Sequence, residues 1–440
     1  MLILDRRQIQ PATPSWPLVE TAQSTLVGLI AGMLGLAPLA APVLLGVLTL
    51  LTITVEWQNG GSPIATFISG LRMPASLACL AFLGFAAISS VWSSEPMFGL
   101  VTVFRVSMTF FAALYLTLAL RQQMSGMTAV HRTRFVRAIP MGALFAVLVL
   151  LVEFLTDNGL SGLIFKLAPG LWSGSPKLIV AKAGEAARLV PEPFMHNRGV
   201  AAMVVLAPVF MLGIAIWQKR SVNSWTIPLS ALVLAVTVYL SESETAKLAM
   251  LGGVVSYALA VMRPVGAWRS LSAVCIIGTV LALPLAMVPY WLGVHTWSAA
   301  SFSAQERATI WRNTAVSTLN RPLFGVGVQS TRFQESDLPK IETPSGKLRS
   351  PLGWHAHNAF LQTWFELGAA GALGLLVAIL SLIGASRRLD QSIHPAAAAL
   401  VTIVLCTAAT GWSLWQPWLI ATFAFGAVFI AMLDAAREKD

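Results

Sequence analysis

Long runs of apolar residues, separated by short polar segments, recur along the whole chain. A helix needs roughly 17–25 mostly apolar residues to cross the hydrocarbon core of a membrane. Runs of about this length predict twelve spans, near residues 20–36, 39–55, 73–91, 98–120, 138–156, 198–217, 225–240, 246–262, 271–292, 366–385, 396–411 and 417–434. The pattern predicts an all-α, polytopic membrane protein, with residues 1–440 forming one integral membrane domain.

The loop charges predict the orientation, because short loops rich in Lys and Arg stay in the cytoplasm. The short loops near 37–38, 92–97, 241–245 and 412–416 hold no Lys or Arg, so we place them outside and both termini inside. Pro38 and Pro42 could mark either a tight turn or a kink in one longer span. Merging the first two spans would place Arg6 and Arg7 outside, so we favour two. The cytoplasmic segments then hold Arg6, Arg7, Arg72, Arg121, Arg132, Arg134, Arg137, Lys219, Arg220, Arg263, Arg269, Arg387, Arg388, Arg437 and Lys439.

Composition agrees with this class, since 56% of the residues are hydrophobic, 11% are charged and the mean hydropathy is +0.73. The formal net charge is +10, but topology explains 15 of the 29 basic residues, so no nucleic-acid binding is needed. No signal-peptide pattern follows Arg6 and Arg7, and we expect the first span to remain as an uncleaved anchor. Cys79, Cys275 and Cys406 fall inside predicted spans and offer neither a disulfide framework nor a metal site.

Two long loops lie on the non-cytoplasmic side, at 157–197 and at about 293–357, or 293–365 with the motif that follows. Loops longer than roughly 15 residues are usually functional or carry structure of their own. Residues 303–306 read Ser-Ala-Gln-Glu, a capping box that predicts a helix start. Its less polar face holds Ile310, Trp311, Thr314, Ala315 and Thr318, and Asn320-Arg321-Pro322 ends it before the turn Gly325-Val326-Gly327. We expect this helix to lie over the bundle as part of a lid.

The segment from His355 to Gly368 gathers proton-transfer groups where an apolar helix begins, in a chain with six histidines. Chemistry at a membrane boundary is one interpretation, and helix capping by His355 and His357 is the other. Asn358, Gln362 and Glu366 are spaced by four residues and form one polar stripe on a helix. The stripe could orient His357 or an acceptor sugar, or its members could bond to one another.

The long loops also carry basic residues that topology does not explain, which suits an anionic substrate or simply a solvated surface. Arg198 stands where a span begins, and Arg307 falls in the first turn predicted from the capping box. A cation is disfavoured at that positive helix end unless an anion shares the site. Guanidinium groups match phosphate oxygens bidentately, so both positions favour a bound phosphate.

Three motifs together resemble the bacterial O-antigen ligase family, within the superfamily that also holds polysaccharide polymerases and protein oligosaccharyltransferases. They are Asn197-Arg198-Gly199, then Glu306-Arg307 leading through Ile310-Trp311 to 321–327, and His-Ala-His-Asn at 355–358 followed by Leu361, Gln362, Glu366 and Gly368. The resemblance covers residues 190–380 by motif and the remainder by topology.

The resemblance implies a glycosyltransferase of the bacterial inner membrane that acts on the periplasmic face. It implies a donor glycan on undecaprenyl pyrophosphate and, for ligases, lipid A-core as acceptor. His357 is the implied catalytic residue, and Arg198 and Arg307 are the implied pyrophosphate ligands. His355 also falls in the motif. The turn 241–247 is more acidic than the family pattern, so Lys247 either binds phosphate or pairs with Glu244.

Chemistry supports the same expectation. A positioned base accelerates the attack of a sugar hydroxyl by roughly 10²–10⁴, and arginines can neutralise a pyrophosphate leaving group. We therefore expect no metal and no cofactor, and inversion at the anomeric carbon. A lipid-linked glycan transporter is the competing class, but its midplane charges and internal repeats are missing from the sequence.

Overall fold

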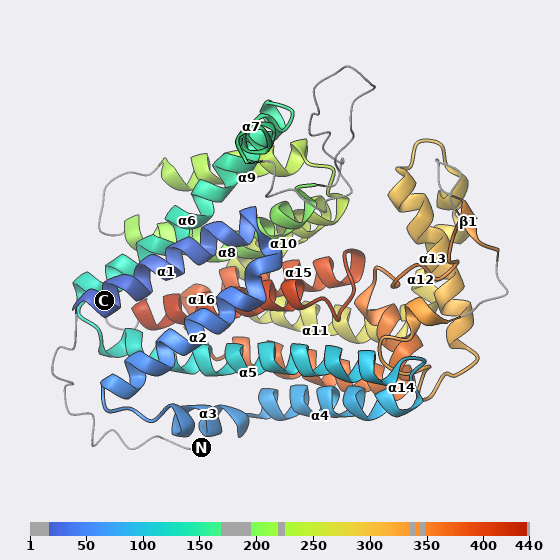
Figure 1. The fold of residues 1–440 in the computed structure, drawn as a ribbon, viewed down its shortest axis with the longest axis horizontal. Coiled ribbons are helices and arrows are strands. Elements are labelled where there is room, and N and C mark those ends of the chain that lie inside the picture. The colour runs from blue at the N-terminus through green and yellow to red at the C-terminus, as the bar shows by residue number, and fades with distance from the viewer. Residues whose placement is uncertain (1–16, 169–194, 219–224, 335–338, 343–347, 438–440) are drawn as a thin grey trace.

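The computed structural model describes residues 17–168, 195–218, 225–334, 339–342 and 348–437, and the described residues are almost entirely helical (Figure 1). The chain first forms α1 (Pro17–Leu36), η1 (Pro38–Ala40), α2 (Ala41–Gln58), α3 (Pro63–Leu71), α4 (Pro74–Ser89), η2 (Ser90–Trp92), α5 (Pro96–Gly126), α6 (Ala129–Leu155), α7 (Gly159–Leu167) and α8 (Asn197–Gln218). It continues with α9 (Thr226–Leu240), α10 (Glu244–Met262), α11 (Pro264–Val280), α12 (Ala282–Trp291), η4 (Val294–Thr296), α13 (Phe302–Thr318), η5 (Thr331–Phe333), α14 (Ala359–Ser386), η6 (Gln391–Ile393), α15 (His394–Thr410) and α16 (Pro417–Arg437). A two-residue antiparallel pair, β1 (Ile341–Glu342) and β2 (Leu348–Arg349), lies before α14.

Proline sets several helix starts, since it is the first residue of α3, α4, α5, α11 and α16. Its fixed φ suits the first helical turn, and the N–H that it lacks would have no partner there. The 3₁₀ turn η1 separates α1 from α2, so the first two predicted spans are two helices, as the charge argument favoured.

Nine described helices are long and apolar enough to cross a membrane, so this is a multi-pass membrane protein. The pair α11 and α12 adds a tenth span only if both helices are counted together, because the chain bends by 77° between them. The predicted span at 271–292 therefore corresponds to a bent pair of helices. Two further predicted spans correspond to shorter apolar helices, Thr21–Leu36 and Thr226–Leu240.

Helices α8 and α16 form the centre of the bundle. About 83% of the apolar window of α8 and 78% of that of α16 is buried inside the protein, against 28–50% for the other long helices. Helix α8 packs on α6, α15 and α16, while α16 also packs on α5 (Figure 1). The remaining long helices expose apolar side chains at their outer faces, as helices in contact with lipid do.

Helices α12 and α13 pack on each other and on the first part of α14 (Figure 1). Helix α13 is capped by Ser301, whose side chain accepts from the Ala304 N–H at 3.3 Å. The helix therefore begins two residues before the predicted capping box, and the prediction that Ser303 is the cap is wrong. The predicted inner face is confirmed, because Ile310, Thr314 and Ala315 are buried.

Helix α14 is interrupted at Gly368, whose φ of 65° and ψ of −163° are not helical. The break frees backbone groups that the preceding loop takes up. The N–H groups of Val326 and Gly327 donate to the carbonyls of Phe365 and Glu366, at 3.1 and 2.8 Å. In return the Ala369 N–H donates to the Pro322 carbonyl at 2.8 Å. A Cβ at Gly368 would lie 2.4 Å from the Leu323 carbonyl carbon, so this crossing requires glycine.

Candidate functional site

Helix α13 positions the backbone around the two histidines. The indole N–H of Trp311 donates to the Ala356 carbonyl at 2.7 Å, and the Asn313 amide donates to the Pro351 carbonyl at 3.1 Å. The side chain of Asn358 caps α14 by accepting from the Leu361 N–H at 3.0 Å. Between these anchors, His357 adopts a φ of 52°, which is uncommon outside glycine and costs conformational energy. The neighbouring contacts hold His357 in this conformation.

Hydrogen bonds define different roles for the two imidazoles. The Nδ1 atom of His357 lies 2.8 Å from the Gly411 carbonyl oxygen, which can only accept, so Nδ1 carries the proton and Nε2 keeps its lone pair. The backbone N–H of His357 donates to Nδ1 of His355 at 3.2 Å, which leaves the proton of His355 on Nε2. The ring centroids are 4.1 Å apart. His357 therefore presents a proton acceptor, and His355 presents a donor.

Both imidazoles are neutral at ordinary pH. The pKa of His357 is lowered from 6.5 to about 4, chiefly by burial and then by the charge of Arg307, against the opposing effect of the Gly411 hydrogen bond. The pKa of His355 is lowered to about 2 by burial and by the nearby charges of His357, Arg307 and Arg332. A neutral His357 is ready to accept a proton, although the positive charges around it make it a weak base in the empty site.

Among the arginines, the charge of Arg307 has the largest effect on the pKa of each of the two histidines. Its Nη1 donates to the Thr245 hydroxyl at 3.4 Å, while its buried Nε has no hydrogen-bond partner among the described residues. Burial lowers the pKa of Arg307, and nearby Glu306 and Glu244 oppose that effect. An unpaired, buried guanidinium N–H is costly unless an anion binds there. Because α13 begins at Phe302, Arg307 lies in the second turn, where burial and not the helix dipole disfavours an unpaired cation.

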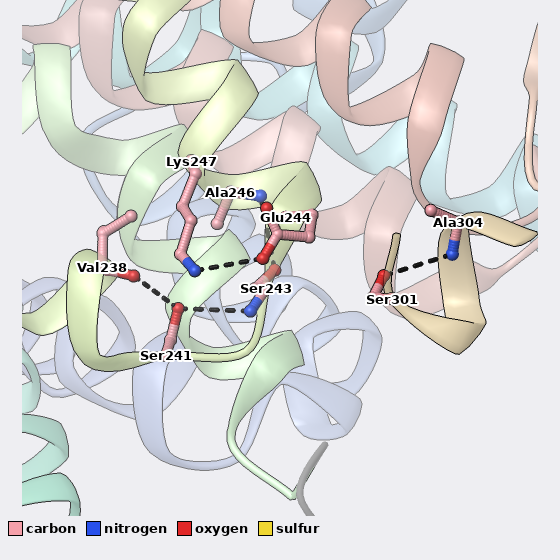
Figure 2. A network of polar contacts seen from close by, with 8 residues as sticks. All are labelled: Val238, Ser241, Ser243, Glu244, Ala246, Lys247, Ser301 and Ala304. Carbon is pink, nitrogen blue, oxygen red and sulfur yellow. Dashed lines mark hydrogen bonds and ion pairs between the residues drawn. The ribbon is translucent and has the colours of Figure 1, made fainter. Parts of the chain in front are cut away.

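Thr245 connects Arg307 to the segment that holds His357. Its hydroxyl donates to the Thr410 carbonyl at 2.9 Å, one residue before Gly411. Thr245 is the second residue of α10, and Figure 2 shows the turn before this helix, in which Ser243 caps α10 by accepting from the Ala246 N–H at 3.3 Å. Ser241 accepts from the Ser243 N–H at 3.3 Å. These hydrogen bonds fix the start of α10, whose Thr245 contacts both Arg307 and the residue before Gly411.

Lys247 takes the second of the two roles left open for it. Its ammonium group lies 3.1 Å from a Glu244 carboxylate oxygen, and Figure 2 shows the two side chains pointing toward each other. Both side chains are partly exposed, at 35% and 57%. Such a pair contributes little to stability. Lys247 as a phosphate ligand remains a prediction, and it would have to exchange this partner.

The polar stripe on α14 is used internally. Glu366 is fully buried and accepts four hydrogen bonds. The Thr331 hydroxyl at 2.5 Å and the Gln362 amide at 3.0 Å share one oxygen. The Trp415 indole N–H at 2.6 Å and the Gln329 backbone N–H at 3.1 Å share the other. Glu366 therefore joins α14 to the loop after α13 and to the α15–α16 turn, which is the self-satisfied alternative.

Arg198 lies at the second residue of α8 with an exposed side chain. Its neighbour His196 lies 2.8 Å, through Nε2, from the Asn158 side-chain oxygen, just after α6. Within the described residues no hydrogen bond or ion pair joins Arg198 to Arg307 or His357. Four of the basic residues of the two long loops, Lys177, Lys182, Arg188 and Lys347, lie outside the described residues.

Gly411 and Thr245 were not recognised from the sequence. Gly411 acts through a backbone carbonyl, which every residue has, and only the turn between α15 and α16 brings it to His357. Thr245 lies close to Lys247 in sequence, but a threonine near the start of a helix is usually interpreted as a helix cap and not as a binding residue. Among the described residues, no group of three or more His, Cys, Asp or Glu side chains could hold a metal ion.

Comparison with known proteins gives a match to one family model. Residues 229–376 match the family model described as O-antigen ligase. This segment includes α10, α13 and the start of α14, so the resemblance drawn from the motifs is confirmed, and the enzymes of this class are ligase-type glycosyltransferases.

Curated relatives agree with this class. A protein of Rickettsia conorii named "Putative polysaccharide ligase" is 24% identical over 308 residues, which is 69% of this chain and 68% of the relative. A relative of Rickettsia prowazekii with the same description is 22% identical over 357 residues, 80% of this chain and 79% of its own length.

Proposed function

We propose that this protein is an O-antigen ligase. It transfers a glycan from undecaprenyl pyrophosphate to lipid A-core at the periplasmic face of the bacterial inner membrane. The family match and the polysaccharide ligases among its relatives support the class. Two observations together carry the mechanism: among the described residues, no hydrogen bond occupies Nε2 of the neutral His357, and the buried Nε of the half-buried Arg307 has no partner.

In the proposed reaction, His357 Nε2 accepts the proton of the acceptor hydroxyl. The hydroxyl oxygen attacks the anomeric carbon, and the bond from that carbon to the pyrophosphate oxygen breaks on the opposite face. Undecaprenyl pyrophosphate leaves with the electron pair, and the configuration inverts. The Gly411 carbonyl holds the Nδ1 proton in place and stabilises the imidazolium that forms.

Arg307 and Arg198 pair with the pyrophosphate in this scheme. Charge neutralisation improves the leaving group, so arginines supply what a divalent metal supplies elsewhere. A bound pyrophosphate also cancels the charge of Arg307, which is a named cause of the low pKa of His357. The donor thereby makes its own base stronger, and His355, through its Nε2 proton, can donate to a sugar oxygen nearby.

The deciding experiment supplies purified protein in detergent, without any gradient, with undecaprenyl-pyrophosphate glycan and one acceptor at a time. Lipid A-core, a second lipid-linked glycan and an acceptor protein separate ligase, polymerase and protein oligosaccharyltransferase. Transfer to lipid A-core alone supports the proposal. Growth of the glycan chain on the lipid would indicate a polymerase. Absence of transfer to every acceptor would favour a transporter.

Variants test the assigned roles in the same assay. His357→Ala should bind donor normally and lose roughly 10²–10⁴ in single-turnover rate, while His355→Ala should lose less. Arg198→Ala and Arg307→Ala should weaken donor binding, and Lys should restore it poorly at either position. Lys340→Ala, an exposed cation on the same long loop, is the matched control. Wild-type donor affinity in both arginine variants would remove the proposed pyrophosphate site.

A further inference from the structure

A cluster of aromatic rings around one cation lies next to the histidine pair. The guanidinium carbon of Arg332 is 5.2 Å from the ring centroid of Phe98, 5.7 Å from that of Phe333 and 5.2 Å from that of Trp354. Phe98 and Phe333 meet edge to face, with centroids 5.6 Å apart. We call Phe98, Arg332, Phe333 and Trp354 the Arg332 cluster.

The cluster is exposed at the surface of the protein. Trp354 is 75% exposed, Phe333 41% and Phe98 37%, and Arg332 itself is exposed. Among the described residues no carboxylate pairs with Arg332, and the contacts recorded for its guanidinium group are the three ring faces. A guanidinium group stacked on rings keeps its N–H donors, which lie in its own plane, available to a ligand.

The backbone that carries Arg332 is fixed. The Ser93 hydroxyl donates to the Val328 carbonyl at 2.8 Å, and the Ser94 N–H donates to the Ser330 hydroxyl at 3.0 Å. Ser330 and Thr331 are buried, and Thr331 donates to Glu366. Arg332 and Phe333 therefore project from a rigid segment, as the residues of a preformed binding surface do.

The position of the cluster separates it from the proposed donor site. Trp354 is adjacent to His355 and three residues from His357, so its Cα lies within about 11 Å of the His357 Cα. The charge of Arg332 helps to lower the pKa of His355. Arg307 reaches the start of α10, whereas Arg332 lies over the first turn of α5. Helix α10 packs on α15 and α11, and α5 packs on α16 and α2, so the two cations contact different helices of the bundle.

We propose that the Arg332 cluster is the acceptor subsite, in which a sugar ring of the acceptor stacks on Trp354 and an anionic substituent of that glycan pairs with Arg332. An exposed indole face suits the C–H face of a sugar ring, and the unpaired guanidinium suits a phosphate or carboxylate on the same glycan. The acceptor hydroxyl is thereby brought toward Nε2 of His357, while the donor stays at Arg307. This inference rests on the proposed glycosyl transfer and adds the chemistry of the acceptor.

The test measures the full-length protein in lipid nanodiscs with three acceptor oligosaccharides freed of lipid. One bears phosphate, one bears carboxylate in its place and one is neutral. Direct binding is followed without donor, and KM and kcat are followed with donor. Arg332→Gln should raise the Kd and KM for the matching charged acceptor about tenfold, leaving the neutral acceptor and the KM for donor unchanged. Trp354→Ala should weaken all three acceptors, and Trp354→Phe should recover part of the loss.

The controls separate this proposal from the proposed function. Lys340→Gln removes an exposed positive charge from the same long loop and should change no acceptor constant. Wild-type transfer together with unchanged acceptor Kd and KM in Arg332→Gln and Trp354→Ala would overturn the subsite. A loss of nanodisc insertion with unchanged acceptor constants would overturn it too, and would assign the rings to the membrane interface. Absence of transfer by the wild type, with charged-glycan binding that still depends on Arg332, would count against the transfer reaction instead.

Discussion

Glu366 offers a sharp test because two of its four hydrogen-bond donors can adapt and two cannot. The Thr331 hydroxyl can rotate to accept, and the Gln362 amide can turn its own buried and unpartnered oxygen toward a new donor. The Trp415 indole N–H and the Gln329 backbone N–H can only donate. In Glu366→Gln, the new amide nitrogen can face the adaptable pair while its oxygen still accepts from the obligate pair.

The structure therefore predicts opposite outcomes for two substitutions. Glu366→Gln should lose less than about 1 kcal/mol of unfolding free energy, because the two groups that can only donate, the Trp415 indole N–H and the Gln329 N–H, keep their acceptor. Glu366→Leu has a similar size but leaves at least two buried donors unpaired, at about 1–3 kcal/mol each, so about 2–6 kcal/mol is lost. The loop after α13 and the α15–α16 turn, which carries Gly411, should loosen together.

The assay combines the midpoint of heat-induced aggregation with single-turnover transfer at equal membrane insertion. Glu244→Gln and Glu244→Leu are the matched controls, because Glu244 is an exposed carboxylate whose ion pair should contribute about 0–1 kcal/mol. A Glu366→Gln protein of normal stability that loses transfer a hundredfold would refute the reasoning. The carboxylate charge would then act on a substrate, as the other interpretation of the polar stripe holds.

Three further predictions concern the base and the leaving group. In Gly411→Ala, the new Cβ would lie 2.5 Å from the Thr407 carbonyl oxygen, so the Gly411 carbonyl should move away from His357. The kcat for transfer should then fall about 10–100-fold while the Kd for donor stays unchanged. An unchanged kcat would show that the Gly411 carbonyl does not position His357. The pKa of His357 is lowered to about 4 in the empty site, so kcat/KM should stay constant from neutral pH to below 6.5 and decline only as the pH falls through that pKa. His357→Ala should lack this decline. A decline already complete at pH 6 would contradict the lowering of the pKa by burial. Chelators should leave transfer by the purified protein unchanged, and inhibition reversed by a divalent ion would refute metal independence.

Much of the bundle could be predicted from the sequence, because a membrane span is a local property. A helix in lipid must satisfy its own backbone and present apolar side chains, so length and hydropathy along the chain suffice. The boundaries of α4, α8, α10 and α16 lie within a few residues of the prediction. The motifs at 306–327 and 355–368 likewise pointed to the family, because each one is continuous in sequence. The bend between α11 and α12 was missed, because both helices are apolar and hydropathy says nothing about the direction of the chain.

Helix starts were less certain, because several residues near 301–306 can cap. The capping box with Glu306 predicted Ser303 as the cap, whereas the helix in the structure is capped by Ser301. This difference moves Arg307 from the first turn to the second, where burial and not the helix dipole bears on its charge.

The site itself was decided by the tertiary structure, because its contacts join segments far apart in the chain. The sequence alone identified His357 and Arg307 as candidates by residue type and motif. It left open which histidine accepts a proton, since the tautomer depends on the Gly411 carbonyl, 54 residues away. The same holds for Glu366, whose role depends on donors from Thr331 and Trp415, and for Arg332, whose aromatic neighbours come from α5 and from the segment before His355. Hydrophobic pattern fixes which segments enter the membrane, but the identity of a polar partner is set only when the packed helices bring their ends together.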